Sequence, residues 1–187
     1  MSRSFSDNSL VLILSNAMDL KEENVALTSV LSRNNYNVVI ITSNLPASIL
    51  TKEYESKGIE MKNVYFIDLI TRYALGSNPG NSDSVQYVST PENLTEIGIA
   101  ITKLLNNIEN DRIVFLFDSV TSMLIYTSSD KITRFLHFIV NKIRLKNSKG
   151  IFMATGGGIN PALLMQLRTF VDAVIEDKEE IDDFFSS

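Results

Sequence analysis

Short, unbroken apolar segments alternate with amphipathic helical segments along this chain, and this alternation restricts the fold more than any other feature. The apolar segments are rich in β-branched residues and cover residues 9–15, 37–43, 64–70, 112–119, 150–156 and 172–176. The helical segments cover residues 22–34, 46–58, 90–108, 129–147 and 160–171. Strands that are apolar throughout are typical of parallel sheets with helices on both faces. The sequence therefore predicts an α/β fold with a mainly parallel sheet.

The length and composition predict a single domain with a substantial core. The chain has 187 residues, of which 44% are hydrophobic and 21% are charged, and we see no internal repeat. The longest unbroken apolar runs have five residues, Leu10–Leu14 and Ile113–Phe117, whereas a membrane span needs about 20. The polar first nine residues have no apolar signal core. We therefore expect a soluble, cytoplasmic protein without a membrane span.

Helix boundaries and one long polar stretch also stand out. Thr90 is predicted to be an N-cap with Pro91 at the first helical position, and Asn160 to cap the helix that contains Pro161. The polar stretch 71–89 is long for a connection in a compact α/β unit. It is predicted to be either a mobile loop or a binding loop.

The absence of cysteine and the single histidine exclude several kinds of chemistry. The chain has no cysteine, so thiol catalysis, disulfides and cysteine-ligated metals are excluded. His137 is the only histidine, so the chain cannot form a multi-histidine metal cluster. It flanks the apolar stripe of a helical segment, and we expect it to lie beside a packed helix face.

Charge is concentrated at the end of the chain. The last twelve residues, "EDKEEIDDFFSS", hold six acids and one lysine, whereas the preceding residues hold 16 acids and 16 bases. A neutral body with an acidic tail argues against nucleic-acid binding, which needs clustered basic residues. The tail, residues 177–187, is predicted to be flexible and solvated. The alternative is a docking peptide, because two phenylalanines lie among its acids.

Polar residues stand at the ends of the apolar segments, where open parallel sheets bind their ligands. Asp118 and Ser119 end the fourth segment, Asp68 lies near the end of the third, and Ser43 and Asn44 end the second. These residues are candidates for a common site at one edge of the sheet.

A glycine run, Gly156, Gly157 and Gly158, follows the fifth segment and leads into a capped helix. Its backbone N–H groups near a helix N-terminus are suited to bind an anion. The alternative is a plain flexible turn, because a glycine triplet is not a specific signal.

The succession of segments resembles the RecA-like ATPases of the KaiC type, which are abundant in archaea and share the P-loop NTPase fold. The resemblance is carried by "NVVIITSNLPASIL", "YESKGIEMKNVYFID", "IVFLFDSVTSMLIY", "FLHFIVNKIRLKNSKGIFMAT" and "FVDAVIE". It covers roughly residues 9–176 and implies one RecA/KaiC-like domain over residues 1–176. It also implies that the fifth apolar segment lies between the first and the fourth. Asp118 stands where the Walker B strand of that family holds magnesium.

The chain departs from that family at the phosphate loop. The loop reads G-x-x-x-x-G-K-[ST], and its backbone and lysine hold the phosphates. This chain has "SNAMDLKEENVALTSVL" instead, without glycine. The resemblance places Glu22 at the last glycine, Glu23 at the lysine and Asn24 at the Ser/Thr position. Lys21 is near the gap, but two carboxylates would repel a triphosphate.

A second feature of the family, an acidic pair that activates water, is also missing. The resemblance, aligned on Pro46, places Ser43 and Asn44 there, and neither is a general base near neutral pH. Asp118 then has two interpretations. It caps a turn by accepting backbone hydrogen bonds, or it is a residual site for magnesium or nucleotide.

These features predict a non-hydrolysing KaiC/RecA-like pseudo-ATPase with a regulatory or scaffolding role, rather than an enzyme. We expect a monomer or weak dimer that contacts a protein partner or an active paralogue. No cofactor is predicted beyond weak binding of magnesium nucleotide. The residues for such binding are Asp118, with the metal, and Ser119, Gly156, Gly157 and Gly158. Two alternatives stay open: an ATPase with a phosphate site built from the glycine run and Asp118, and a small-ligand sensor that uses the strand ends and the 71–89 loop.

Overall fold

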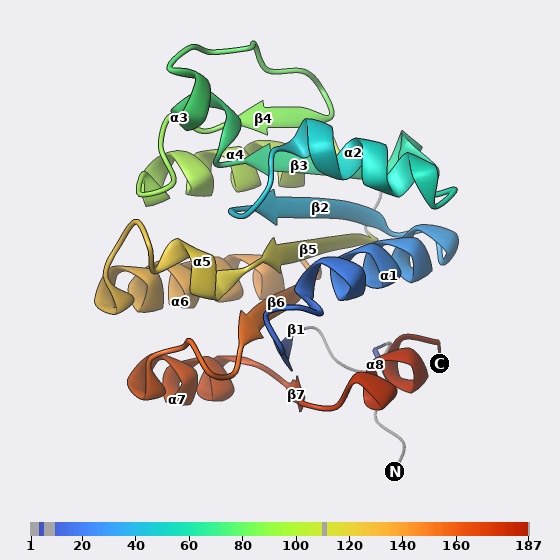
Figure 1. Cartoon of the computed structure of the whole chain (residues 1–187), viewed down its shortest axis with the longest axis vertical. Coiled ribbons are helices and arrows are strands. Elements are labelled where there is room, and N and C mark those ends of the chain that lie inside the picture. Colours follow the sequence, from blue (N-terminus) through green and yellow to red (C-terminus); the bar gives the residue numbers. More distant parts are fainter. Residues whose placement is uncertain (1–3, 6–9, 110–111, 187) are drawn as a thin grey trace.

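A seven-stranded, all-parallel sheet forms the centre of the molecule (Figure 1). The computed structural model describes residues 4–5, 10–109 and 112–186. The strands are β1 (Leu10–Ser15), β2 (Asn37–Thr42), β3 (Val64–Asp68), β4 (Val85–Tyr87), β5 (Ile113–Asp118), β6 (Lys149–Thr155) and β7 (Ala173–Ile175). Their order is β4-β3-β2-β5-β6-β1-β7, and all pairs are parallel. The predicted fold class is confirmed, and β6 lies between β1 and β5 as the resemblance implied.

Burial on both faces explains why the strands are apolar throughout. Every residue of β2 and β5 is buried, and successive side chains of a strand point to opposite faces of the sheet. In the parallel register, Thr42 of β2 pairs with Asp68 of β3 and with Asp118 of β5. The last residues of these three strands therefore lie level at the carboxyl edge of the sheet.

Two layers of helices cover the sheet (Figure 1). One layer consists of α1 (Leu20–Arg33), α2 (Ala47–Ser56) and α8 (Lys178–Ser186). The other layer consists of α4 (Leu94–Asn107), α5 (Val120–Met123), α6 (Ser129–Leu145) and α7 (Pro161–Phe170). The short helices η1 (Met61–Asn63) and α3 (Thr71–Leu75) flank β3. Each face of the sheet thus packs its own hydrophobic core against helices.

The stretch 71–89 is more structured than the sequence predicted. It contains α3 and the edge strand β4, which pairs with β3. The strand has three residues, of which only Gln86 is buried. Because an edge strand this short buries so little, no apolar run marks it in the sequence.

The start of α4 also differs from the prediction. The helix begins at Leu94, and its N-cap is Asn93 rather than Thr90. The side-chain oxygen of Asn93 accepts a hydrogen bond from the Glu96 N–H at 3.1 Å. Thr90 instead begins a turn, in which its carbonyl accepts from the Asn93 N–H at 3.1 Å. Asparagine is at least as good an N-cap as threonine. The helix therefore begins at Leu94, three residues after the predicted first residue, Pro91.

The acidic tail forms α8 rather than the flexible segment that the sequence predicted. Ile181, Phe184 and Phe185 are buried in the same core as α1 and α2. The rings of Phe185 and Phe5 lie 4.7 Å apart, and the Phe5 N–H donates to the Phe184 carbonyl at 3.0 Å. The phenylalanines of the tail therefore pack on the body of their own chain.

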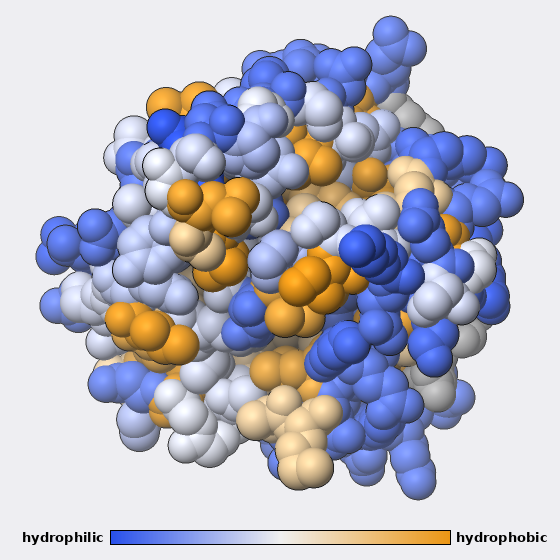
Figure 2. Space-filling view, turned by 45° about the horizontal axis from the view of Figure 1, so that its top comes forward, coloured by the Kyte–Doolittle hydropathy of each residue, from blue (hydrophilic) through white to orange (hydrophobic). Residues whose placement is uncertain are grey.

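The surface drawn in Figure 2, seen with the top of Figure 1 tilted forward, is mostly hydrophilic. Its hydrophobic residues lie in small, separate groups that hydrophilic or intermediate residues border. Within the described residues, no helix combines the length and the hydrophobicity that crossing a membrane requires.

Candidate functional site

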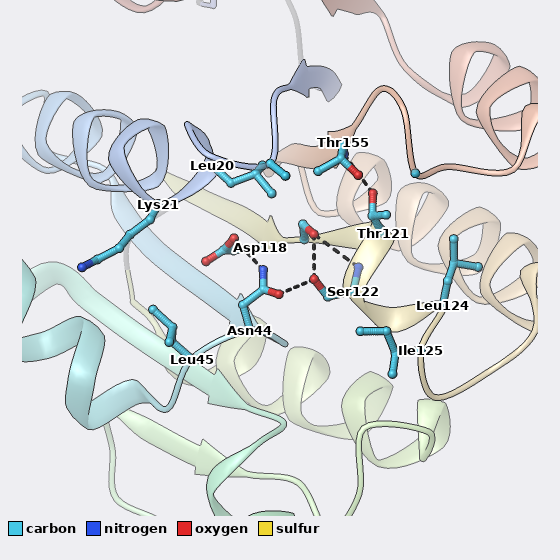
Figure 3. Close-up of a pocket in the computed structure, with 13 residues that line it drawn as sticks. Leu20, Lys21, Asn44, Leu45, Asp118, Thr121, Ser122, Leu124, Ile125 and Thr155 are labelled. Atoms are coloured by element: carbon cyan, nitrogen blue, oxygen red, sulfur yellow. Dashed lines mark hydrogen bonds between the residues drawn. The ribbon is translucent and has the colours of Figure 1, made fainter.

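A cavity of about 540 Å³ opens at the carboxyl edge of the sheet (Figure 3). Asp118 and Ser119, at the end of β5, and Asn44, in the loop after β2, contribute its polar lining. Its apolar lining comes from Leu20, Leu45, Leu124 and Ile125. The structure therefore brings the predicted residues Asp118, Ser119, Asn44 and Gly158 together around one cavity.

Asp118, the last residue of β5, is held by two amide side chains. Its Oδ2 accepts a hydrogen bond from Asn24 Nδ2 at 2.8 Å, and its Oδ1 accepts from Asn44 Nδ2 at 3.4 Å. The residue is only 4% exposed. Burial raises the pKa of its carboxyl to about 6, although both amide hydrogen bonds act in the opposite direction. A buried carboxylate stabilised by neutral donors is thus the central group of the site.

Asn24 is the residue that connects α1 to this carboxylate. Its side chain is fully buried, and its Oδ1 accepts a hydrogen bond from the Tyr54 hydroxyl. This bond fixes the amide orientation, so that the Nδ2 group faces Asp118. Tyr54 of α2 is also buried, and its burial raises the pKa of the hydroxyl, which keeps it a donor. Tyr54, Asn24 and Asp118 thus form a continuous buried chain of hydrogen bonds.

Serines tie the strand ends together beside Asp118. Ser43 Oγ donates to the Ser119 carbonyl at 3.0 Å and accepts from the Ser119 N–H at 3.1 Å. Ser119 also caps α5, since its Oγ accepts from the Ser122 N–H at 3.3 Å. Asn44 Oδ1 accepts from the Ser122 hydroxyl (Figure 3). Ser43 and Asn44, which the resemblance placed at the acidic pair, therefore act as connectors between β2 and β5.

Asp68 lies at the same edge but has a separate, structural role. Its carboxylate accepts from the N–H groups of Ala47 at 2.7 Å, Ile70 at 2.8 Å and Thr71 at 2.8 Å. These bonds hold the turn after β3 and the beginning of α2. The turn-capping role that was considered for Asp118 is performed by Asp68, whereas the carboxylate of Asp118 accepts bonds from amide side chains.

The glycine run forms a turn in which two backbone N–H groups already donate hydrogen bonds within the protein. The Gly156 N–H donates to the Ser15 carbonyl and the Gly158 N–H to the Thr155 carbonyl, both at 3.3 Å. A Cβ atom on Gly158 would lie 2.9 Å from Thr155 Oγ1. A side chain at this position would therefore require the Thr155 side chain to move. Two of the three N–H groups that would receive an anion are already engaged.

The surroundings of the glycine run are also acidic. Gly156, Gly157 and Gly158 line a second cavity of about 620 Å³ together with Asp19, Glu23 and Glu176. Lys178 is the one basic residue among the described residues that line it. It lies 3.4 Å from a carboxylate oxygen of Glu22. A cavity with this excess of carboxylates repels phosphate groups.

A short turn connects β1 to α1 directly. Residues 16–19 form a turn, and α1 begins at Leu20 with Glu22 and Glu23 in its first turn. Asp19 is at the N-cap position, but its side chain makes no capping hydrogen bond. Glu23 is buried and accepts from the Ser15 hydroxyl. The connection is therefore closed by its own side chains.

Lys21 points away from Asp118 (Figure 3). Its Nζ forms an ion pair with Glu53 of α2 at 2.9 Å. The charge of Lys21 is therefore directed toward α2.

The groups around Asp118 are poorly suited to magnesium. In the described part of the chain, no three or more His, Cys, Asp or Glu side chains cluster closely enough to hold a metal ion. Both carboxylate oxygens of Asp118 face amide N–H groups, whereas magnesium prefers oxygen ligands in an octahedral arrangement. A cation at Asp118 would have to displace these donors.

Two features of the site had no signal in the sequence. Tyr54 lies 30 residues after Asn24 in another helix, and no motif links the two. Leu124 and Ile125 follow the short α5 and become part of the cavity only through the fold. Asn24 itself was singled out by its place in the helix after the missing loop.

Comparison with known proteins identifies a family and a fold. Residues 11–177 match a family that is described only as a family of unknown function, DUF7504. No curated protein matches the chain.

Among solved structures, a KaiC-like protein, PH0186, from the hyperthermophilic archaeon Pyrococcus horikoshii OT3 superposes with a TM-score of 0.61 and 15% identity. The match covers 89% of this chain and 69% of that protein. The uncharacterised protein PH0321 from Pyrococcus horikoshii, solved in complex with an unknown peptide, gives a TM-score of 0.66 and 16% identity. That match covers 89% of this chain and 76% of PH0321. The fold is therefore that of KaiC-like, RecA-like domains.

Proposed function

The chain belongs to the family of unknown function DUF7504, and we propose that it is a RecA-like domain that does not hydrolyse ATP and acts through contacts with other proteins. The observation that carries the proposal is the 2.8 Å hydrogen bond from Asn24 Nδ2 to Asp118 Oδ2. A regulatory or scaffolding role beside an active relative follows from such a domain.

The magnesium side of the site supports this proposal. In P-loop ATPases, a Ser/Thr hydroxyl and the Walker B aspartate hold the magnesium ion. By resemblance, Asn24 and Asp118 stand at those two positions. Here the neutral amide of Asn24 donates a buried hydrogen bond to the Asp118 carboxylate, in the position where an ATPase would have the metal ion. In this proposal, the hydrogen bond between Asn24 and Asp118 takes the place of the magnesium ion that coordinates the phosphates in P-loop ATPases.

The phosphate side supports the same conclusion. A bound triphosphate needs backbone N–H groups and a lysine that neutralises its charge. Glu23, at the lysine position, is buried against Ser15, and Lys21 is paired with Glu53. A triphosphate there would meet carboxylates and a closed helix N-terminus, both of which oppose binding.

Protein contacts are the remaining use of such a domain. PH0321, which shares the fold, was solved in complex with an unknown peptide, and peptide binding by this chain would be consistent with that example. RecA-like ATPases commonly build rings with nucleotide at the subunit junctions. A domain without tight nucleotide binding lacks that bridging ligand, so we expect a monomer or a weak dimer.

A phosphate-release assay with magnesium and ATP tests the proposal. We expect no hydrolysis above background in the wild type, in Asp118→Ala or in Glu23→Ala, because no described residue provides the loop, the lysine or the base. Hydrolysis that is lost in Asp118→Ala but kept in Glu23→Ala would contradict the proposal. It would support an ATPase with an atypical phosphate site.

A small-ligand sensor is the second candidate, and the 540 Å³ cavity is the observation that favours it. Sites for small molecules combine an apolar lining with a few converging polar groups, and Asp118 and Asn44 provide these groups here. A melting-temperature increase with a small metabolite in the absence of nucleotide would support the sensor. The increase should become smaller in Ile125→Trp, which adds bulk at the exposed edge of the cavity.

A further inference from the structure

We propose that the groove between α4 and α6 docks an acidic amphipathic helix of a partner protein. The groove encloses about 840 Å³ on the face of the sheet opposite α1 and α2. The inference extends the protein contacts of the proposed function to one surface. It shares no residue with the cavity at Asp118, so the two are tested separately.

The groove exists because small residues of α4 face aromatic residues of α6. Gly98 lies opposite Phe135 and Phe138, and a Cβ atom built on it would already be in van der Waals contact with their rings, at 3.9 Å and 4.0 Å. Thr102 continues the same line one turn further along α4. The small residues on this line leave a channel between the two helices. The Lys142 side chain of α6 crosses it, since its Nζ donates to the Thr102 hydroxyl and lies 5.2 Å from the centre of the Phe138 ring. With 14 residues, α4 is about 21 Å long at 1.5 Å per residue, enough to seat about four helical turns.

The lining of the groove is apolar and accessible. Phe138 is 56% exposed and Ile99 is 63% exposed, on opposite sides of the channel. Exposed large apolar residues that gather in a groove mark interaction sites, whereas scattered ones do not. A helix with an apolar stripe at i, i+3, i+4 and i+7 fits such a groove.

Charge selects the kind of helix. The basic residues along the groove are Lys103, Lys131, Arg134 and Lys142. In the part of the chain that the structure describes, none of these four forms an ion pair with a carboxylate. Lys103 donates to the neutral side chain of Gln86, and Lys142 to that of Thr102. A basic edge without internal counter-charges, on a chain of net charge −5, is complementary to an acidic partner.

A recessed apolar floor distinguishes this partner from other polyanions. Nucleic acid binding depends on many phosphate contacts, and the exposed Phe138 and Ile99 would be left against phosphates. Phe138 and Ile99 are exposed enough to meet a membrane surface, so vesicle binding is one of the outcomes tested below. Phe135, only 7% exposed between the helices, instead favours an occupant that inserts apolar side chains into the groove. The acidic amphipathic helix is the occupant that matches both the floor and the edges.

Fluorescence anisotropy with the full chain tests the charge argument. The probe is a labelled helical peptide of about 16 residues, with a Leu/Phe stripe and Glu at the other positions. We expect saturable binding that weakens about tenfold in the variant Lys131→Glu/Arg134→Glu. The matched control is Lys52→Glu/Lys57→Glu, a pair of exposed lysines at α2 on the other face, which should change binding less than about twofold.

A second pair of variants tests the exposed apolar lining. Phe138→Ala should weaken binding about tenfold, because it removes the exposed ring from the groove. Leu145→Ala, on the same helix but outside the groove and 85% exposed, should leave binding unchanged.

Four results would overturn the inference. The first is no binding of the acidic peptide by the wild type. The second is equal binding of a peptide with the same stripe and Lys in place of Glu. The third is binding of phosphatidylserine vesicles, but not of peptide, that the groove variants abolish, which would identify a membrane surface. The fourth is a wild-type dimer that Lys131→Glu/Arg134→Glu dissociates, which would identify a second copy as the occupant.

Discussion

At the scale of single residues, the centre of the site is a buried carboxylate that neutral amide side chains hold. Asp118 is 4% exposed, and burial raises the pKa of its carboxyl from 3.8 to about 6. Asn44 and Asn24 oppose this shift by donating to the charged form. Because the charged form is disfavoured in the fold, the folded protein binds this proton more tightly than the unfolded chain does.

Ionisation of Asp118 should therefore lower the free energy of unfolding as the pH rises. A raised pKa contributes stability that is fully present below the unfolded value of 3.8 and is lost as pH rises through about 6. Asp118→Asn cannot ionise, so its unfolding free energy should rise relative to the wild type by about 2 kcal/mol between about pH 4 and about pH 7.5. Urea unfolding at the two pH values measures this change. The exposed Asp83→Asn is the matched control, and a difference for Asp118→Asn that is independent of pH would contradict the account.

The members of the site could be predicted only where the backbone alone fixes their place. The carboxyl ends of parallel strands meet at one edge of the sheet. Asp118 is the last residue of β5 and Ser119 follows it, and β2 is followed by Ser43 and Asn44. Tyr54 could not be predicted, because its bond to Asn24 depends on how α1 and α2 pack.

At the scale of elements, α8 changes the picture of the acidic tail. Its apolar residues Ile181, Phe184 and Phe185 are spaced at i, i+3 and i+4, which places them on one face of a helix. All three are buried. The acids between them lie at other helix positions, and Glu179 and Glu180 in the first turn are favoured by the helix dipole. The tail is thus an amphipathic helix that completes one layer.

Removing an aromatic ring from α8 should destabilise the whole domain. Phe185 is 4% exposed and packs against Phe5 and Phe184. We expect Phe185→Ala to lower the unfolding free energy by about 3 kcal/mol, from lost burial and the remaining cavity. Glu179→Ala, at an exposed position of the same helix, should change it by less than about 0.5 kcal/mol. Guanidinium unfolding measures both, and equal effects would mean that α8 does not support the fold.

The predicted elements succeeded or failed for identifiable physical reasons. The cap of α7 was predicted correctly, because Asn160 accepts from the Ala162 N–H at 2.8 Å and Pro161 follows it. The start of α4 was wrong, because the side chain of Asn93 competes with that of Thr90 for the N-cap position. The α8 helix was missed because the acid content of "EDKEEIDDFF" outweighed its helical spacing.

At the scale of the whole molecule, the sequence predicted the fold but not the groove that we propose as an interaction surface. Strands that are apolar throughout indicated the parallel sheet, and the resemblance gave the position of β6 between β1 and β5. The groove between α4 and α6 could not be predicted, since Gly98 and Phe138 face each other only after both helices pack on the sheet. Surfaces of this kind depend on which helices become neighbours.

The assembly state is the prediction that belongs to this scale. We expect a monomer or a weak dimer in nucleotide-free buffer, because an interface bridged by nucleotide in related rings would lack its ligand here. Light scattering over a range of protein concentrations measures the mass. A stable hexamer would show that the subunit interface does not depend on nucleotide, and would contradict this expectation.

Calorimetric titration of magnesium-ATP into the purified protein measures whether the site at Asn24 and Asp118 binds nucleotide. If the bond between Asn24 and Asp118 replaces the ion and the loop is gone, the wild type should give no saturable heat at millimolar nucleotide. The double variant Glu22→Gly/Glu23→Lys should behave the same way, since neither change rebuilds a glycine loop. Saturable binding at micromolar magnesium-ATP by the wild type would contradict the account. Such binding by the double variant alone would show a site that is blocked rather than dismantled.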